Sequence, residues 1–550
     1  MHLDQEQEIP QKPKMTGVLL FVGLFILGVS VQQTFSLENG DLFWHLRIGE
    51  LMMDAGGLLS QDPLTFNAEG KAWTQHEWGA QLMLAAVHRL GGWWGLRILR
   101  GLLVGFTLAF LALAFWRRCP RAGAVVMGLA LYWLLIEPFS SMRPHLMGWL
   151  LLAIGYYLFL SVQGPWRKLR WFGFVFWLVA WVNIHSSAVI VPGLCALAAA
   201  EVLIRMMVLR RRNSDLLWHW IRMGALSGAA VLLQPAGLDL AFYVMETQAL
   251  NNVASREWLP LFRLDVWQGN SHLITFFVML SASTLLASFL SYRRKEPGDA
   301  FPLVLPALAA LFFAFSTRRM LFLTYIPIHL VLREAHAWFL SRRDTWQGLL
   351  KRRWLIPLLA GLVVISVLAW SFERRPGPLE PGPFAPGCVA EKGVAFLQDA
   401  QIQGRMVNID YWGGFLAYYL HPRYKTFIDG RWLMVGREAF KDMVAMMTHE
   451  PNMESLADKY GIDFIVQPVE VWSRVLPPDP NRWVLAYQDE MTVIALRRGD
   501  RFDENARRVC AYYARHPEQS LHARWADLTH PACQERPCVR IPSLRGKPPR

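Results

Sequence analysis

The residues whose types could carry chemistry are concentrated in one segment, residues 38–77, which follows directly on an apolar run. A helix beginning near Asp41 places most of its charged residues on one face, but it places Asp41 and His45 on the opposite, apolar side. Charged groups on the apolar side of an interfacial helix are costly unless a function needs them. A partly desolvated carboxylate beside a hydroxyl group can act as a general base. Asp41 is therefore the first catalytic candidate, and His45, one helical turn away, is expected to assist it.

Three arginines form a second group of candidates, at the ends of apolar segments that face away from the basic loops. They are Arg143, Arg318 and Arg319. A cation on this side breaks the positive-inside rule, and a guanidinium group suits a phosphate at the level of the lipid headgroups. The alternative is that these side chains snorkel from helix ends or pair with a carboxylate such as Glu257 or Glu137.

The remaining pocket candidates are carboxylates and histidines in the same predicted layer: Asp62, His76, Glu77, His145, His185 and Glu257. Each carboxylate has an alternative role as a helix cap or a loop ion pair, and Asp62 before Pro63 is typical of a turn. The histidines could bind a metal with Glu77, but no zinc-type spacing supports this, and they would otherwise be hydrogen-bonded interfacial histidines. We expect that no cofactor is required, with a divalent metal as the alternative.

Composition and hydropathy indicate what positions these residues. The chain has 550 residues, of which 53% are hydrophobic and only 18% charged, with 25 Trp and 32 Phe. This predicts a polytopic α-helical membrane protein with room for one additional small domain. The net charge of +13 comes from Lys and Arg in short loops between apolar runs. The positive-inside rule explains this charge better than nucleic-acid binding does, and no nucleic-acid partner is expected.

Loop charge predicts a topology. Placing every basic loop in the cytoplasm gives about 11 spans between residues 15 and 373. Residues 1–14 are then a cytoplasmic tail, 15–37 a retained signal anchor without an evident cleavage site, and 38–93 a long outer loop. Within this loop, residues 77–92 are too short to span and predict a second interfacial helix that ends at glycines. The apolar middles of the spans hold almost no charge, which argues against a route through the membrane.

The part of the chain after the last span is predicted to lie outside the cytoplasm. Residues 374–387 form a Pro/Gly linker, 388–516 a small α/β domain, and 517–550 a tail containing Pro, Arg and Cys. Its expected strands are RMVNI, KTFID, DFIVQP and TVIAL. Four of the six cysteines fall in this region, namely Cys388, Cys510, Cys533 and Cys538. Disulfides in any of three pairings are expected, with a zinc site or buried free thiols as alternatives.

The predicted C-terminal domain adds a further set of candidates on loops near strand ends. They are Asp410, Trp412, Asp429 and Arg431. We expect them to help present an acceptor. The alternative is ordinary packing and turn chemistry.

Taken together, these segments resemble the GT-C superfamily of membrane glycosyltransferases. The resemblance rests on the signal anchor, the outer loop with an acidic residue just after the span, and the exported domain. The matching pieces are DLFWHLRIGE, DPLTF, HEWGAQ, MRPH, NIHSS, QPAG, REWLP, DYWGGFLAYYL and FIDGRW. The protein looks closest to a group of bacterial membrane proteins related to protein O-mannosyltransferases and the aminoarabinose transferase of lipid A. The chain departs from the family in having no DxD motif, which leaves metal dependence open.

The resemblance implies an activity and a location. A sugar would be transferred from a polyprenyl-phosphate-linked donor to a hydroxyl of a glycan, lipid or protein acceptor, at the outer face of the bacterial inner membrane. In this family the early acidic residue serves as the base or orients the acceptor, a position that Asp41 occupies here, and arginines near later outer loops engage the lipid phosphate. The alternatives are a flippase, a partner in polysaccharide assembly, and a scaffold whose exported domain binds a partner.

Overall fold

The computed structural model describes residues 15–35, 37, 40–160, 166–208, 213–240, 242–243, 256–263, 271–293, 302–342, 355–373, 390–475, 478–479 and 481–517. The chain divides into two compact units. The first, here called the bundle unit, comprises residues 1–36, 97–241 and 251–378. The second, the sheet unit, comprises residues 37–96, 242–250 and 379–550. The expected linker, most of the expected tail, and Cys388, Cys533 and Cys538 lie outside the described residues.

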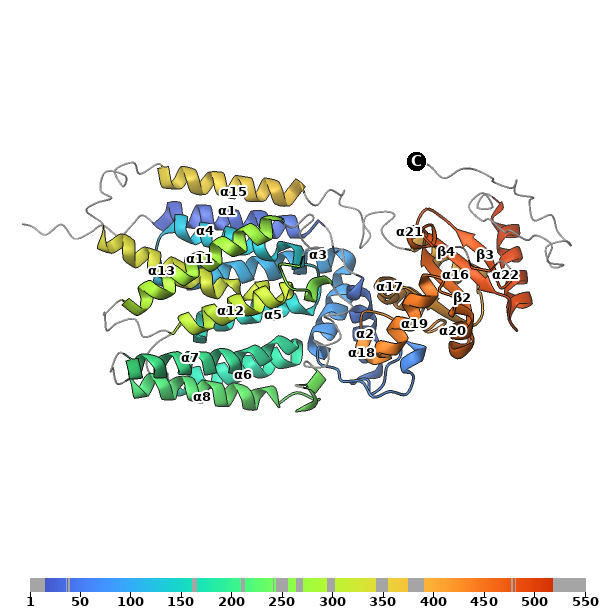
Figure 1. The fold of residues 1–550 in the computed structure, drawn as a ribbon, viewed down its shortest axis with the longest axis horizontal. Helices are drawn as coiled ribbons and strands as arrows, with labels where there is room; N and C mark the ends of the chain where they lie inside the picture. Colours follow the sequence, from blue (N-terminus) through green and yellow to red (C-terminus); the bar gives the residue numbers. More distant parts are fainter. Residues whose placement is uncertain are drawn as a thin grey trace, which may run out of the picture. The chain divides into compact units, whose positions relative to one another are not determined.

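The bundle unit consists of apolar helices. They are α1 (Met15–Gln33), the second part of α3 (Trp78–Arg118), α4 (Ala122–Ile136), α5 (Pro144–Gly155), η3 (Tyr156–Leu160), α6 (Lys168–Ile184), η4 (Ser186–Val189), α7 (Ile190–Val208), α8 (Ser214–Val231), η5 (Arg256–Trp258), α11 (Ser271–Arg293), α12 (Val304–Ser316), η6 (Arg318–Thr324), α13 (Tyr325–Ser341) and α15 (Leu355–Glu373). Figure 1 shows α1, α4 and α15 side by side, and likewise α6, α7 and α8.

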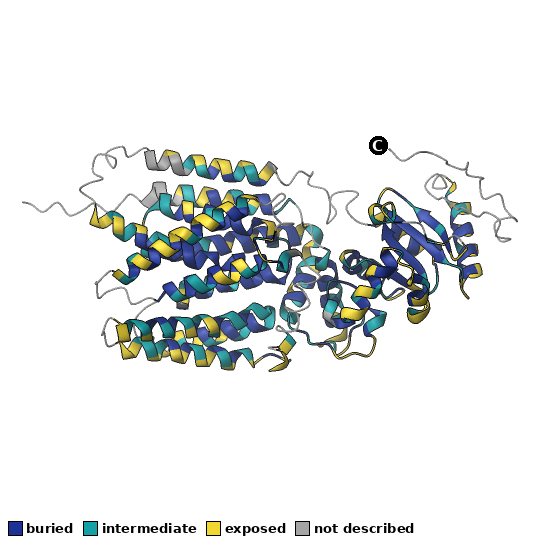
Figure 2. Ribbon diagram, viewed as in Figure 1, coloured by how far each residue is buried: buried dark blue, intermediate teal, exposed yellow. Residues whose placement is uncertain are grey.

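Burial in this unit follows the pattern of a membrane protein. Trp133 and Trp181 are fully buried between helices, whereas large apolar side chains such as Phe172 and Met207 are exposed. Figure 2 shows buried and exposed positions alternating along the helices of this unit. Exposed apolar surface of this extent is expected where helices face lipid. Within the described residues four helices are long and apolar enough to span a bilayer, and four shorter apolar helices accompany them. The total of about 11 spans stays a prediction.

The sheet unit contains a four-stranded mixed sheet in the order β1-β2-β4-β3. Its strands are β1 (Arg405–Asn408), β2 (Ile462–Pro468), β3 (Trp483–Gln488) and β4 (Thr492–Arg497), and only the β1–β2 pair is parallel. Its helical elements are α2 (Asp41–Ala55), η1 (Phe66–Ala68), the first part of α3, α16 (Glu391–Ala400), α17 (Asp410–Leu420), α18 (Trp432–Val435), α19 (Arg437–Met447), α20 (Met453–Tyr460), α21 (Val469–Trp472) and α22 (Phe502–Arg515).

Both faces of this sheet are covered by helices. Phe464 and Val466 of β2 pack with α16, α17 and α22, while Ile465 between them packs with α19 and α20. This alternation is what a strand buried on both faces requires. The expected strand KTFID was wrong, because only an isolated bridge joins Thr426 to Thr65 there, and the unexpected segment Trp483–Gln488 forms β3 instead.

The interfacial helix expected over residues 77–92 is the first part of α3. Gly92 has a non-helical backbone (φ 55°, ψ −150°) at the point where the two parts of α3 meet. A positive φ is readily adopted by glycine because it has no Cβ atom. The glycines therefore end the first helical part, as their positions in the sequence predict.

Candidate functional site

Asp41 is the first residue of α2, and its carboxylate is half-buried in the sheet unit. Its Oδ1 atom accepts a hydrogen bond from the indole Nε1 of Trp44 at 3.3 Å. A carboxylate in the first turn of a helix is favoured by the partial positive charge of the helix N-terminus. Helix α17, which begins at Asp410, packs against α2, so the two motifs DLFWHLRIGE and DYWGGFLAYYL lie together.

Four glycines allow these segments to approach at backbone distance. A methyl group on Gly40 would overlap the carbonyl oxygen of Tyr411, and one on Gly414 would lie 2.5 Å from the carbonyl oxygen of Gly40. In the same way, a methyl on Gly413 would overlap the backbone at Ile428, and one on Gly430 would overlap the Asp41 carboxylate. Glycine is required where two backbones or a backbone and a side chain come this close. The surroundings of Asp41 are therefore built largely from main chain, and we call them the glycine junction.

Asp410 is the second carboxylate at the glycine junction. Burial raises the pKa of Asp410, and the nearby negative charge of Asp41 raises it further. The neighbouring Tyr411 ring is 53% exposed, and burial raises the pKa of its hydroxyl to about 12. The junction thus places two carboxylates and an exposed aromatic ring together, a combination that can bind a hydroxyl-bearing molecule.

His45, one helical turn after Asp41 in α2, takes part in a short chain of polar residues. Its Nε2 atom lies 3.8 Å from Glu77, and Glu77 lies 3.8 Å from His76 on its other side. The Nε2 atom of Gln81 is 3.4 Å from His45 Nδ1. His45 is only 2% exposed, whereas His76 is half-buried and its ring contacts Tyr243. His45 is thus placed to orient its neighbours and has little surface for contact with a substrate.

Asp62, Asp429 and Arg431 form a buried ion cluster. Arg431 donates to Asp62 at 2.7 Å and to Asp429 at 2.6 Å, and all three side chains are nearly inaccessible to solvent. The Arg431 guanidinium also faces the rings of Trp44 and Trp73 at 5.4 and 4.9 Å.

The charges of this cluster hold two loops together. Burial would raise the pKa of Asp62, but the charge of Arg431 and hydrogen bonds from Thr65 and Leu64 outweigh it and lower that pKa. Burial raises the pKa of Asp429. These residues join the loop at 62–65 to the loop at 427–432, and their side chains are occupied with one another. Trp412, 2% exposed, belongs to the hydrophobic core of the sheet unit.

In the bundle unit, two arginines share one carboxylate. Nη2 of Arg143 donates to both oxygens of Glu257 at 2.9 and 3.0 Å, and Arg319 lies 3.6 Å from the same carboxylate. Partial burial opposes ionisation of Glu257, but Arg143 and Arg319 outweigh it and lower the pKa to about 2. The guanidinium of Arg319 lies 5.2 Å from the ring centre of Trp258. These residues, here called the arginine pair and its carboxylate, carry a net positive charge.

The other predicted residues of the bundle unit are Arg318, His145 and His185, and they differ in their contacts. Arg318 is 8% exposed, its backbone N–H donates to Leu259, and its charge also lowers the pKa of Glu257. His145 bonds through Nε2 to the carbonyl of Phe139 at 2.8 Å. His185 Nδ1 accepts from the backbone N–H of Ser187 and caps η4.

One group of charged residues was missed in the sequence. Glu201 and Arg205 of α7 form an ion pair at 2.8 Å, and Arg333 and Glu334 of α13 form another at 2.9 Å. Both arginines donate to the hydroxyl of Ser291. Glu201 also accepts from the backbone N–H of Leu305 at the start of α12.

The spacing Glu201–Arg205 (i, i+4) was the available signal for this buried network, because such residues are neighbours on a helix. The expectation that charge in the spans lies almost entirely at their outer ends is therefore incomplete. Among the described residues, no group of three or more His, Cys, Asp and Glu side chains is arranged to hold a metal ion. Cys510 is disulfide-bonded, and Cys119 and Cys195 are buried free thiols.

No protein-family model and no curated protein matches this sequence. Solved structures do match. The aminoarabinose transferase ArnT from Cupriavidus metallidurans in the apo state aligns with a TM-score of 0.50 and 14% identity, covering 88% of this chain and 98% of that one. The same enzyme bound to undecaprenyl phosphate aligns with a TM-score of 0.49 and 13% identity, again covering 88% and 98%. An oligosaccharyltransferase from Archaeoglobus fulgidus, in complex with Zn and sulfate, aligns with a TM-score of 0.53 and 12% identity, covering 87% of this chain and 73% of that one.

The chain has a GT-C fold. At these identities the likeness concerns the fold alone, and the expected resemblance is confirmed at that level. A GT-C fold together with the apolar helices identifies the protein as a membrane protein.

Proposed function

We propose that this protein transfers a sugar from a polyprenyl-phosphate-linked donor to an acceptor hydroxyl at the outer face of the bacterial inner membrane. The GT-C fold and the membrane helices support glycosyl transfer from a lipid-linked donor in general. The observation that carries the proposal is the arginine pair and its carboxylate, Arg143, Arg319 and Glu257.

The charge of this cluster suits a lipid phosphate. Two guanidinium groups face one carboxylate, and Arg318 adds a third positive charge close enough to act on Glu257. Glu257 is 31% exposed and Arg319 28% exposed, so an anion can reach the cluster without entering the hydrophobic core. A phosphate would join or replace Glu257 and accept charge-assisted hydrogen bonds from both guanidinium groups. The same groups would stabilise the lipid phosphate as it leaves.

Asp41 supplies the base in this proposal. Its carboxylate takes the proton of the acceptor hydroxyl, and the hydroxyl oxygen attacks the anomeric carbon. A new C–O bond forms there with inversion, and the bond to the phosphate oxygen breaks, so that the lipid phosphate leaves with the electron pair. His45 and Glu77 position Asp41, and Asp410 with Tyr411 contacts the acceptor. The step needs no covalent enzyme intermediate.

Complementation in cells tests this assignment. If the proposal is right, deleting the gene should remove a glycan, lipid or protein modification from the cell envelope, which mass spectrometry of envelope fractions would detect. Asp41→Asn and Arg143→Gln should fail to restore it, because removing a general base costs about 10²- to 10⁴-fold in rate. The matched control is Asp54→Asn, since Asp54 lies on the same helix but is 61% exposed and pairs with Arg89. If Asp41→Asn restores the modification as well as the control does, Asp41 is not the base.

A transport role is the second candidate, and the buried network of Glu201, Arg205, Arg333 and Glu334 is the observation that favours it. Ionisable groups inside a bundle mark many transport routes. The network is balanced, with two positive and two negative groups, which also suits a structural role. Reconstitution of the purified protein in vesicles distinguishes a flippase from a glycosyltransferase. A flippase would move a labelled polyprenyl phosphate between the two leaflets, and its Asp41→Asn variant would do so as well.

A further inference from the structure

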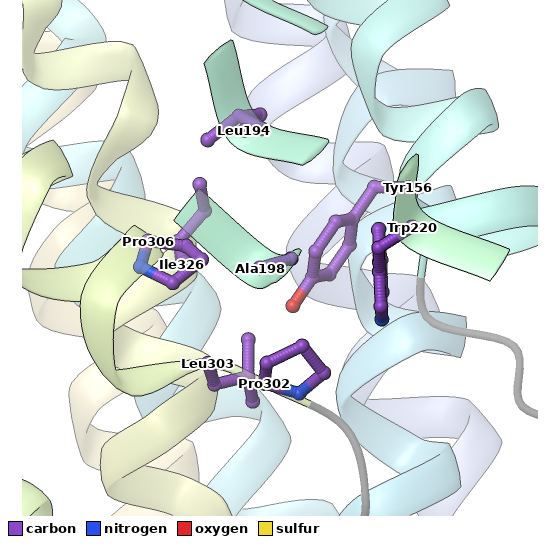
Figure 3. Close-up of a pocket in the computed structure, with 8 residues that line it drawn as sticks. All are labelled: Tyr156, Leu194, Ala198, Trp220, Pro302, Leu303, Pro306 and Ile326. Atoms are coloured by element: carbon purple, nitrogen blue, oxygen red, sulfur yellow. The ribbon is translucent and has the colours of Figure 1, made fainter. Parts of the chain in front are cut away.

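A cavity in the bundle unit is too small to bind an acceptor. Figure 3 shows Tyr156 and Trp220 on one side of this cavity, with Pro306 and Ile326 on the other. Its volume of about 20 Å³ holds about one water molecule, and its lining is almost entirely apolar. A sugar is much larger than this and needs hydrogen-bond partners. The glycine junction of the sheet unit offers such partners beside Asp41.

The surface of the glycine junction combines aromatic rings with carboxylates. The Tyr411 ring is 53% exposed and follows Asp410 in the chain. Trp432, which is half-buried, lies beside Asp410. Carboxylate oxygens accept hydrogen bonds from hydroxyl groups, and an aromatic ring packs against the apolar face of a ligand. A sugar presents both kinds of surface, so this part of the sheet unit suits a sugar.

The charges at the junction disfavour an anionic acceptor. Asp41 and Asp410 lie close enough together that the negative charge of Asp41 raises the pKa of Asp410. Arg431 follows one of the junction glycines in the chain, but its guanidinium already donates to Asp62 at 2.7 Å and to Asp429 at 2.6 Å. With two carboxylates bound to it, this arginine supplies no net positive charge to a ligand.

The exposed side of Tyr411 adds no net positive charge either. Glu470 lies near enough for its negative charge to act on the Tyr411 hydroxyl, and burial and these charges raise the pKa of that hydroxyl to about 12. Arg474 pairs with Glu470 at 2.5 Å, and both side chains are exposed. A phosphate or carboxylate on the acceptor would therefore meet like charges at Asp41 and Asp410, which repel it.

The strand that leads into the junction is closed to an added peptide strand. Strand β1 lies at one edge of the sheet and ends at Asn408, two residues before Asp410. The Asn408 side chain donates to the carbonyl of Ile428 at 2.9 Å and accepts from the backbone N–H of Phe427 at 2.8 Å. A peptide that binds by extending a sheet needs an open edge. These hydrogen bonds cover the end of β1 that lies next to the junction.

We propose that the acceptor is a glycan, and that the sugar bound at the glycine junction carries no phosphate or carboxylate group. The inference rests on the proposed function, because it takes Asp41 as the base for the acceptor hydroxyl. The sugar ring packs against Tyr411, one hydroxyl donates to Asp410, and the reacting hydroxyl donates to Asp41. Neutral sugars and amino sugars meet these requirements. Phosphorylated sugars, uronic acids and lipid phosphate headgroups do not.

Photocrosslinking in cells tests the proposal. Tyr411 is replaced by the photoreactive residue p-benzoylphenylalanine in the full-length protein, in cells that lack the wild-type gene. Met53, which is 36% exposed and lies about 18 Å from Asp41 along α2, carries the same residue in the matched control. After irradiation the protein is purified and digested, and mass spectrometry identifies the attached molecule. We expect a sugar adduct without phosphate or uronic acid at position 411, and no such adduct at position 53.

A second variant tests the part played by the carboxylate of Asp410. Asp410→Asn should reduce the yield of the sugar adduct about tenfold, the usual effect of removing a hydrogen bond to a charged group. Asp54→Asn is its control and should leave the yield unchanged, since Asp54 is 61% exposed and pairs with Arg89. If replacing Tyr411 prevents folding, Glu470, which is exposed near Tyr411, carries the photoreactive residue instead.

Several results would overturn the proposal. They are an adduct that contains phosphate or a uronic acid, an adduct that consists of peptide, no more adduct at position 411 than at position 53, and an unchanged yield in Asp410→Asn. The proposed function fails separately. If the sugar adduct forms as expected but Asp41→Asn restores the envelope modification, the acceptor site is right and the base is wrong. If the adduct is phosphorylated and Asp41→Asn restores nothing, the acceptor class alone is wrong.

Discussion

Replacing Glu257 by glutamine should weaken the folded protein and strengthen its binding of a lipid phosphate. The pKa of Glu257 is lowered from its ordinary value of 4.5 to about 2. A shift of this size corresponds to about 3 kcal/mol of preference for the charged form. Because the Glu257 side chain is 31% exposed, solvent screening reduces this to about 1–2 kcal/mol.

The sign of the pH dependence follows from the lowered pKa. The stabilisation from Glu257 is fully present above pH 4.5 and is lost as the pH falls toward about 2. Glu257→Gln should therefore lower the unfolding temperature at neutral pH and abolish this contribution to acid sensitivity. In the variant Arg143 and Arg319 face one another without the carboxylate, so a bound phosphate should restore more stability than it adds to the wild type.

The measurement is thermal unfolding in detergent with and without farnesyl phosphate. We expect about three- to tenfold tighter binding in Glu257→Gln, because the phosphate no longer competes with a carboxylate. Glu504→Gln is the control, since Glu504 forms an exposed pair with Arg508 that contributes little to stability. Equal or weaker phosphate binding by Glu257→Gln would refute the reasoning and identify the cluster as purely structural.

Three further predictions concern other parts of the molecule. Gly430→Ala should reduce transfer activity at least tenfold in the complementation assay, because the added methyl group displaces the Asp41 carboxylate. Gly499→Ala is the control and should match the wild type, since its added methyl group meets nothing within 4 Å. Arg431→Met should lower the free energy of unfolding by about 3–5 kcal/mol in denaturant titrations, because Asp62 and Asp429 then stay buried without their cation; a loss near zero would contradict this. An alkaline phosphatase fusion after Ala385 should be active in cells, and an inactive fusion would invert the proposed topology.

The helices could be predicted from the sequence, because the free energy of transferring a long apolar run from water into the bilayer dominates their formation. The pairing of charges could not. Asp62 and Arg431 are 369 residues apart, and nothing in either segment indicates that they meet in a buried cluster. The pairing of Arg143 with Glu257 was foreseen only as an alternative to phosphate binding.

The glycine-containing motifs were more informative about the site than the charged residues were. The glycines in DYWGG and FIDGRW were recognised as parts of matching motifs, but their physical reason, the close approach to Gly40 and Asp41, depends on tertiary contacts. The strand at Trp483–Gln488 was missed because Pro-rich residues precede it, whereas KTFID has strand composition but lies where no neighbouring strand continues a ladder.

The glycine junction has a consequence for engineering the protein. Peptide groups at four glycines, together with the indole of Trp44, set the spacing around the proposed base, so few neighbouring side chains bear on its location. Libraries that vary exposed positions such as Tyr411 can therefore change which acceptor is bound without moving the carboxylate of Asp41. Selectivity and reactivity would then be adjustable independently in this scaffold.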